Sequence, residues 1–236
     1  SIDKAKTNIE KNIENSKELF QSKLNHIFSQ TGEDWRKVSI ESLCSKTKNI
    51  NWKENTNNEF DYIDLSSVSR ISLEVTDTKK IKMKNAPSRA KKIVEENDVI
   101  FGTTRPTLKR ATKINKKHDG QICSTGFVVL RPINPNDSDW IFYYLLSSKF
   151  MKRMESLQRG ASYPAVSDDD VKKSMLTIPS IDSVKIEQIE TLDILDNHIQ
   201  SLLLSYEEEL ENLEELKKSI LQKAFSGELT NKNKAA

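Results

Sequence analysis

Hydrophobic residues follow three different spacings along this chain, and the first spacing covers residues 1–29. There the apolar positions recur at intervals of three, four and seven residues, with Lys, Glu and Asn between them. They are Ile2, Ile9, Ile13, Phe20, Leu24 and Ile27. Because no proline or glycine interrupts the segment before Gly32, the pattern predicts one continuous amphipathic helix over residues 1–29.

The second pattern, over residues 186–226, is a longer apolar stripe whose steps alternate between three and four residues. Its members are Leu192, Leu195, Ile199, Leu202, Tyr206, Leu213, Leu216 and Ile220. Only Glu209 breaks this heptad series, which predicts a coiled-coil seam rather than a broad globular face. A helix of this length spans about 60 Å, so we expect it to project from the domain or to run along a partner.

Between the two helices the pattern becomes short and rich in β-forming residues. The expected strands lie at residues 61–68, 98–104, 122–132 and 174–179. Residues 140–157 read as a helix with an apolar face, and residues 167–175 as one helical turn opened by Ser167 and acidic residues. We interpret residues 34–180 as one α+β domain with a mixed or partly barrel-like sheet.

The two helices share a repeated stretch. A shift of 197 positions places Leu19 on Leu216 and Phe28 on Phe225, each Phe being followed by Ser. Two similar helices, one entering and one leaving the same domain, are expected to pair as an antiparallel coiled coil; chance similarity between amphipathic helices is the alternative. The residues expected to pair, or to contact a partner, are Leu19, Leu24, Phe28, Leu195, Ile199, Leu202, Leu213, Leu216, Ile220 and Phe225.

Charge is distributed unevenly, although the net charge is only +2. Residues 31–180 hold 26 Lys and Arg against 19 Asp and Glu, whereas residues 181–236 hold 6 against 12. Within the middle, residues 79–117 carry 13 basic residues and three acidic ones. Such a concentration of positive charge favours a polyanionic partner.

Composition also narrows the class of protein. The cysteines Cys44 and Cys123 are read as free thiols of an intracellular protein, and no Cys/His cluster has the spacing of a zinc site. No apolar run approaches the roughly 18 residues of a membrane span, so we expect a soluble, cytoplasmic protein with no membrane partner. The chain begins at Ser1 inside a helical pattern, and we expect the true N-terminus to lie upstream or to have been removed.

Four stretches of the chain resemble a known family. Residues 212–230, NLEELKKSILQKAFSGELT, strongly resemble the distal conserved helix of specificity (S) subunits of type I restriction-modification systems. Residues 8–35 resemble the central conserved helix of the same family. The sequence from Arg159 to Ile181 is similar to the segment that closes its target recognition domains, and residues 98–132 resemble the middle of such a domain.

The resemblance implies a non-catalytic DNA-recognition subunit. A complete S subunit has two target recognition domains, each reading one half of a bipartite double-stranded DNA target, and two conserved helices that set their distance and dock two methyltransferase subunits. This chain resembles the C-terminal half of an S subunit or a half-length S protein, to be completed by a second recognition domain or a second copy. Whether restriction subunits join is left open. S-adenosylmethionine, Mg²⁺ and ATP are expected on the partner subunits, and no cofactor on this chain.

The expected layout is a central-type helix at 1–30, a recognition domain at 34–180, a distal helix at 183–229 and a disordered tail at 230–236.

Three basic segments are the candidate DNA contacts. Residues 102–113, GTTRPTLKRATK, place hydroxyl and cationic donors in an irregular loop marked by Gly102 and Pro106. Arg105 also has the fork that can grip guanine O6 and N7. Residues 158–167 offer a second loop, with Arg159 expected on a phosphate, and residues 79–92 carry an alternation of lysines expected to share one face. The candidates are Lys82, Lys84, Arg89, Thr104, Arg105, Thr107, Lys109, Arg110, Arg159, Ser162 and Tyr163.

Each candidate also has a simpler structural interpretation. The first loop can be merely solvated, the second can be a structural corner with Tyr163 packed, and the lysines can keep an edge strand soluble. No catalytic set is found: Asp168, Asp169 and Asp170 are better explained by a short acidic helix start than by a metal nuclease. Two alternatives to the main interpretation stay open, a coiled-coil scaffold whose basic domain binds RNA or an acidic protein, and a homodimeric half-subunit that reads a symmetric split target.

Overall fold

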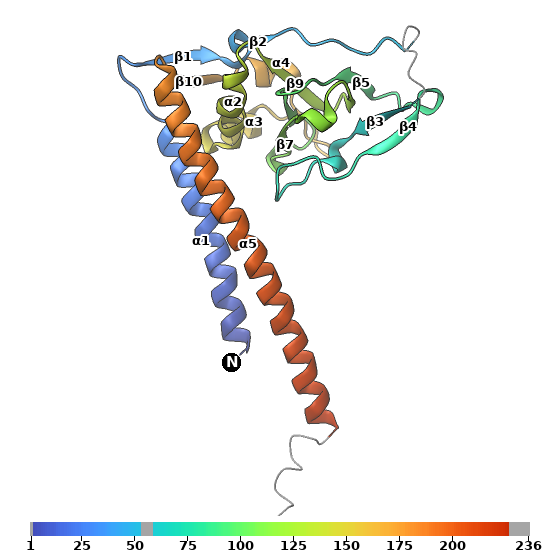
Figure 1. Cartoon of the computed structure of the whole chain (residues 1–236), viewed down its shortest axis with the longest axis vertical. Coiled ribbons are helices and arrows are strands. Elements are labelled where there is room, and N and C mark those ends of the chain that lie inside the picture. The colour runs from blue at the N-terminus through green and yellow to red at the C-terminus, as the bar shows by residue number, and fades with distance from the viewer. Residues whose placement is uncertain (1, 53–58, 227–236) are drawn as a thin grey trace, which may run out of the picture. The chain divides into compact units, whose positions relative to one another are not determined.

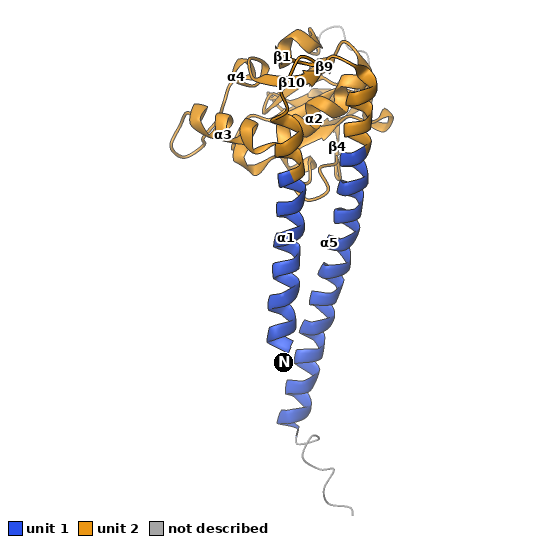
Figure 2. Cartoon of the chain, turned by 90° about the vertical axis from the view of Figure 1, so that its left-hand side faces the viewer, with its two compact units in different colours: residues 1–22, 191–236 blue, residues 23–190 orange. Residues whose placement is uncertain are grey.

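The computed structural model describes residues 2–52 and 59–226, and the chain divides into two compact units. The first unit comprises residues 1–22 and 191–236, and the second comprises residues 23–190 (Figure 2). Each unit is described by itself. The predicted tail at 230–236 lies outside the described residues.

The first unit is a pair of antiparallel helices. It contains most of α1 (Ile2–Phe28) and α5 (Asp182–Phe225), both of which continue into the second unit (Figure 1). Lys6 forms an ion pair with Glu214, and Asp3 forms another with Lys217 at 2.8 Å. Moving three residues forward on α1, from Asp3 to Lys6, moves the partner three residues backward on α5, from Lys217 to Glu214, so the two helices are antiparallel. The predicted fold class, an α+β chain with two long antiparallel helices, is confirmed.

The buried stripe of α5 leaves the predicted heptad positions at Glu209. Leu192, Ile199 and Leu203 are buried, and the stripe then continues through half-buried Tyr206, Leu210, Leu213 and Lys217. The step from Tyr206 to Leu210 spans four residues where the predicted series steps three to Glu209, so the stripe reaches Lys217 instead of Leu216, while Leu213 stays on it.

Four residues expected to pair the helices are exposed in this chain. The exposed fractions are 58% for Leu19, 48% for Leu216, 42% for Ile220 and 89% for Phe225. Their assignment to pairing within the chain is wrong, while their assignment to a partner interface stays a prediction. Ile199 is buried as expected, and Leu195, Leu202 and Leu213 are half-buried.

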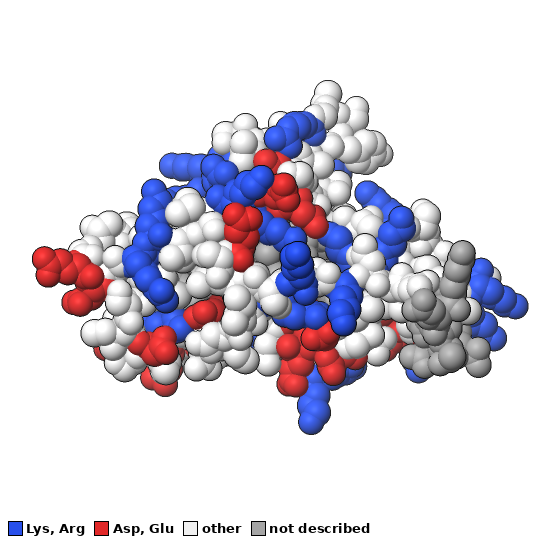
Figure 3. Space-filling view, turned by 90° about the horizontal axis from the view of Figure 1, so that it is seen from above, with Lys and Arg blue, Asp and Glu red and all other residues white. Residues whose placement is uncertain are grey.

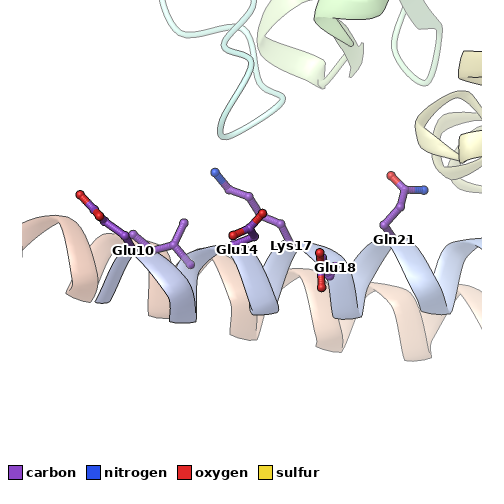
Figure 4. A pocket seen from close by; sticks show the side chains of 6 residues that line it. Glu10, Glu14, Lys17, Glu18 and Gln21 are labelled. Carbon is purple, nitrogen blue, oxygen red and sulfur yellow. The ribbon is translucent and has the colours of Figure 1, made fainter. Parts of the chain in front are cut away.

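A shallow hollow on α1 is lined by charged and amide side chains. Glu10, Glu14, Lys17 and Gln21 project from one side of the helix, with Glu18 and Ile13 beside them (Figure 4). Ligand pockets are lined mostly by hydrophobic and aromatic side chains, whereas the residues around this hollow are charged or amide residues apart from Ile13. It is best explained as the solvated face of an amphipathic helix.

The described residues of the second unit form three sheets. The first pairs β1 (Trp35–Ser39) with β10 (Met175–Pro179). The second has the order β2 (Cys44–Ser45), β9 (Phe127–Pro132), β6 (Val99–Gly102) and β7 (Ala111–Lys113). The third has the order β4 (Lys79–Lys82), β3 (Glu59–Ile63), β8 (Ile122–Ser124) and β5 (Ala90–Ile93). The pairing of β3 with β8 is parallel and the rest are antiparallel, so the predicted mixed pairing holds, and the described strands form open sheets rather than a barrel.

The chain changes sheets in the middle of one predicted strand. Residues 122–132 form β8 and β9, which belong to different sheets and are separated by Thr125 and Gly126. A Cβ on Gly126 would lie 3.3 Å from Leu65 Cδ1, so a larger residue there would require the Leu65 side chain to shift. A core cluster that includes Cys123 from β8 and Phe127 from β9 joins the two sheets.

The predicted helix over residues 140–157 is two helices. They are α2 (Ser138–Leu146) and α3 (Ser148–Leu157), with extended backbone at Ser147 between them. The Ser147 hydroxyl accepts a hydrogen bond from the Phe150 amide and donates one to the Tyr144 carbonyl. Serine competes with the helix backbone in this way, and the apolar pattern that continues through the break concealed it.

Phe28 belongs to the core of the second unit. Its ring lies 4.9 Å from that of Trp140 and 5.5 Å from that of Tyr144, both on α2, and its carbonyl accepts a hydrogen bond from the Thr177 hydroxyl. Leu24, one turn earlier, is fully buried. The helix-pairing role predicted for Phe28 is therefore wrong, because the last turn of α1 is packed into the domain that follows it.

The first turn of α5 is attached to the same unit by a buried ion pair. Lys185 is only 2% exposed, and its ammonium group lies 2.5 Å from Asp137 and 3.0 Å from Asp182. A buried lysine needs such partners, because an uncompensated charge in the interior is strongly unfavourable. This contact fixes where the long helix leaves the domain.

Candidate nucleic-acid interface

The two loops that the sequence analysis singled out separately lie against each other in the second unit. The first connects β6 to β7, and the second connects α3 to α4 (Asp168–Lys172). The Arg105 amide donates to the Pro164 carbonyl at 2.7 Å, and the Val166 amide donates to the Thr103 carbonyl at 3.0 Å. Residues 60 positions apart in the sequence thus form one surface.

Arg105 lies in a strained backbone conformation. It has φ 50° and ψ 59°, and Lys109 at the other end of the same short turn has φ 53° and ψ 38°. Residues other than glycine rarely adopt this left-handed region, and when they do the site is often functional. Pro106 and Leu108 lie within the turn between them.

The Arg105 guanidinium lies over the ring of Tyr163. The distance from its Cζ atom to the ring centroid is 5.2 Å, within the range of a cation–π contact. Tyr163 is 72% exposed, so it is not packed as the structural interpretation of this loop required. An exposed aromatic ring beside a guanidinium is a combination suited to contacts with nucleic acid.

Within the described residues, Arg159, unlike Arg105, forms an ion pair with a carboxylate. Its Nη1 and Nη2 atoms donate to the two carboxylate oxygens of Asp170 at 2.8 and 3.4 Å. Asp170 also accepts hydrogen bonds from the amide and hydroxyl of Ser167, and together these contacts, led by that from Arg159, hold the pKa of Asp170 well below its usual range. This role of Asp170 was not predicted from the sequence. The signal available was the Ser167-x-x-Asp170 spacing of a capping box, which identified only the helix start.

The remaining candidates of the first loop differ in their exposure to solvent. Thr107 is exposed and Thr104 half-buried. Lys109 is also half-buried, and burial lowers the pKa of its ammonium group. Arg110 packs against Gly102, where an added Cβ would lie 3.3 Å from the Arg110 Cβ, and its carbonyl accepts from the Gly102 amide. Arg110 therefore contributes to the structure of the loop, whatever contact its guanidinium makes. In the second loop Ser162 is exposed.

The lysine-rich segment lies at a sheet edge. β4 is the edge strand of its sheet, and Lys80 and Lys82 share one face of it. Lys84 falls in the short turn Met83–Asn85 after the strand, so the expected three-lysine face is two residues long. Lys82, Lys84 and Arg89 are all exposed.

Ion pairs neutralise part of the basic segment. Lys79 pairs with Asp64, Lys92 with Asp168 and Lys113 with Asp139. In the part of the chain that the structure describes, Lys82, Lys84, Arg89 and Arg105 form no ion pair with a carboxylate. Figure 3 shows Lys and Arg in several groups across one face, with Asp and Glu between them.

The acidic helix start is a structural feature. Asp168, Asp169 and Asp170 contact three different cations, namely Lys92, Lys173 and Arg159. Within residues 2–52 and 59–226, no group of three or more His, Cys, Asp or Glu side chains could hold a metal ion. Burial raises the pKa of Cys123 to about 12, which makes it an unreactive thiol.

Comparison with known proteins assigns the class. A sequence model described as "Type I restriction modification DNA specificity domain" matches residues 32–215. The chain belongs to this family. The specificity subunits of such systems are non-catalytic, so this chain is assigned to a non-catalytic class. A search of curated proteins finds no match.

Solved structures agree with this assignment. The HsdS subunit from Thermoanaerobacter tengcongensis is 30% identical with a TM-score of 0.66, over 80% of this chain and 49% of that one. A chain from a study of complex assembly and conformational transition of the type I R-M system is 27% identical, with a TM-score of 0.71, over 88% and 52%. The S subunit from M. genitalium, at 15% identity and a TM-score of 0.53 over 94% and 57%, shows the fold alone. This chain spans about half the length of the relatives it matches. Among the described helices, none has the apolar stretch that crossing a membrane requires.

Proposed function

We propose that this chain is a DNA sequence-recognition component of a type I restriction-modification enzyme. Its second unit reads one half of a bipartite duplex target, and its helices dock methyltransferase subunits. The observation that carries this proposal is the joining of the two candidate contact loops, through Arg105 and Pro164, within a domain of the DNA specificity family.

The chemistry of the joined loops supports contact with duplex DNA. Hydroxyl and guanidinium donors can bind phosphates, and an unpaired guanidinium can reach base edges in the major groove. Lys82, Lys84 and Arg89 add exposed positive charge without a carboxylate partner in the described part of the chain. Such charge contributes affinity that falls steeply with salt.

The exposed apolar residues of the helices support a docking role. Leu216, Ile220 and Phe225 project from the last turns of α5, and Leu19 projects from α1. Isolated helices rarely keep several large apolar side chains in water unless a partner covers them.

S-adenosylmethionine, Mg²⁺ and ATP are proposed to bind the partner subunits rather than this chain.

Selection from a randomised duplex library tests the reading function. The full chain, alone and with its cognate modification subunits, is incubated with the library, and bound duplexes are sequenced. We expect enrichment of one short sequence block, and a weaker preference after Arg105→Ala with Ser162→Ala. The matched control is Lys152→Ala with Ser156→Ala, an exposed cation and serine pair on α3.

The outcomes separate the candidate functions. Binding without any duplex sequence preference, or preference for RNA, would contradict the proposal and favour a scaffold with a basic domain. A retained preference in the loop variant would contradict the site but keep the function. Sedimentation of the chain at micromolar concentration adds the oligomeric state, since a strict monomer excludes the homodimeric half-subunit.

Docking through α5 has a separate test. Leu216→Glu and Ile220→Glu place charge at exposed apolar positions, so we expect the fold to persist and capture of the modification subunits to be lost. Ser219→Glu, between them on the same exposed turn, is the matched control. Equal capture by all three variants would show that the modification subunits bind elsewhere.

A further inference from the structure

The loop of residues 159–167 is tied at both ends by one carboxylate. Asp170, on α4, receives the Arg159 guanidinium from the start of the loop and the Ser167 amide and hydroxyl, at 2.8 and 2.7 Å, from its end. Only 15% of the Asp170 side chain is exposed. A partly shielded carboxylate with several donors is a strong and well-oriented acceptor, so it holds the two ends of the loop together.

Backbone contacts narrow the loop further. Arg159 and Ala165 exchange two hydrogen bonds of 2.9 Å, which leaves residues 160–164 as a tight turn. Gly160 has φ 95°, and a Cβ there would lie 3.1 Å from the Tyr163 carbonyl. The position and outward direction of Tyr163 are thus set by contacts at the base of the loop.

The two arginines of this surface differ in the group that their guanidinium contacts. Arg159 uses two guanidinium nitrogens on Asp170. Arg105 lies on the Tyr163 ring and makes no ion pair in the described part of the chain. A guanidinium stacked on a ring keeps the donors along its edge available, whereas a guanidinium paired through two nitrogens has few donors left.

We propose that Arg105, stacked on Tyr163, is the specificity-determining residue that reads a guanine, and that Arg159 is a positioning residue acting through Asp170. This inference rests on the proposed DNA-reading function, and it goes beyond it by giving the two arginines different tasks. It replaces the phosphate contact that the sequence predicted for Arg159.

The two roles have different physical signatures. Losing a phosphate contact weakens binding to every sequence and lowers the slope of log K against log salt by about one. Losing a positioned base contact reduces the preference for the target over other sequences and leaves the salt slope unchanged. The distinction holds although the Arg159 side chain is 65% exposed, because exposure alone permits either role.

The experiment uses the full chain and two fluorescent duplexes. One is the duplex enriched from the randomised library, and the other is a shuffled duplex of the same composition. Affinities are measured by anisotropy over a series of salt concentrations. The variants are Arg105→Lys, Arg159→Ala and Asp170→Asn, the last of which keeps a side-chain oxygen for the Ser167 amide but removes the charge that holds Arg159. The control is Lys173→Ala, which removes another exposed ion pair to α4 that does not reach the loop.

We expect Arg105→Lys to reduce the preference for the enriched duplex by about 5- to 150-fold, the effect of one bidentate base contact. Arg159→Ala should reduce the preference in the same direction, and Asp170→Asn should reduce it likewise, because it releases Arg159 from its partner. Neither arginine variant should change affinity for the shuffled duplex, and Lys173→Ala should behave as the unmodified protein.

Two results would overturn the inference. The first is an Arg159→Ala variant that loses affinity equally for both duplexes with a lower salt slope, which identifies a phosphate contact. The second is an Asp170→Asn variant that folds normally and keeps the full preference of the unmodified chain, which shows that Arg159 does not act through Asp170. Hydrogen exchange without DNA supplies an independent readout: amides of residues 159–166 should exchange faster in Arg159→Ala, and unchanged exchange would contradict the positioning role. If the unmodified chain prefers no duplex, the proposed function fails first, which is a different outcome.

Discussion

A similar short sequence occurs at the C-terminal ends of both long helices, and it is buried in the first helix and exposed in the second. In the first copy Leu24 is fully buried and Phe28 is 2% exposed, whereas in the second copy Leu221 is 48% exposed and Phe225 is 89% exposed. Both copies are helical. The difference arises because the first copy runs directly into the domain that packs around it, while the described part of the chain has nothing packed over the second.

The repeated sequence therefore specifies two helices with similar apolar faces. It does not specify which part of the protein packs against each face. The first copy meets Trp140 and Tyr144 of α2. The second copy retains the residues that would fill such an aromatic site. A sequence comparison alone assigned both copies to helix pairing, and the structure assigns the first to a domain core.

The largest expected effect is that of removing the buried phenylalanine. Phe28→Ala should lower the free energy of unfolding by about 4 kcal/mol, since it empties a packed aromatic site. The matched change Phe225→Ala should alter it by less than about 0.5 kcal/mol, as at other exposed positions. Denaturant unfolding followed by circular dichroism measures both, and equal losses would show that the two copies are packed alike.

A second pair of variants tests the same comparison one turn earlier. Leu24→Ala should cost about 3 kcal/mol, because a fully buried leucine leaves a cavity. Leu221→Ala, at the equivalent position of the second copy, should leave the denaturation midpoint nearly unchanged. A destabilising Leu221→Ala in the isolated chain would show that α5 is covered at this point.

Ion pairs sharpen the contrast between the two units. Asp137→Asn should lower the free energy of unfolding by about 2 kcal/mol, since it leaves Lys185 buried with a weaker partner. Asp3→Asn removes the exposed pair with Lys217 in the helix unit, and we expect no measurable change. Thermal unfolding in low and high salt provides the check, and a salt-sensitive Asp137 effect would argue that this pair is hydrated.

The smallest expected effect concerns acid stability of the second unit. Burial alone would raise the pKa of Asp64, but hydrogen bonds from Lys79 and Ser66 lower it to about 2. Because the ordinary value is about 3.9, this carboxylate stabilises the fold above about pH 4 and loses that contribution as pH falls toward 2. After solvent screening the contribution is about 1 kcal/mol or less. Asp64→Asn should flatten this part of the stability profile, and an unchanged profile would contradict the assignment.

Local patterns predicted the elements that depend on nearby residues. The spacing of apolar residues predicted α1 and α5 to within a few residues, and Ser167 with its acidic neighbours predicted the start of α4. The basic loops were recognised from composition as candidate contacts. These features depend on helix period, capping and charge, which are properties of short segments.

Contacts between distant segments decided the rest. One β-rich run is divided at Thr125 and Gly126 between two sheets that a shared core cluster joins, whereas the helix break at Ser147 depends on local hydrogen bonds that the continuous apolar pattern concealed. Asp170 receives Arg159, and Arg105 meets Tyr163, across separations that spacing does not encode. The amino-acid sequence by itself determined two amphipathic helices around a basic α+β domain. Only the tertiary structure decided which copy of the repeat is buried and which arginine stays available, because burial and pairing depend on the surfaces that the folded chain brings together.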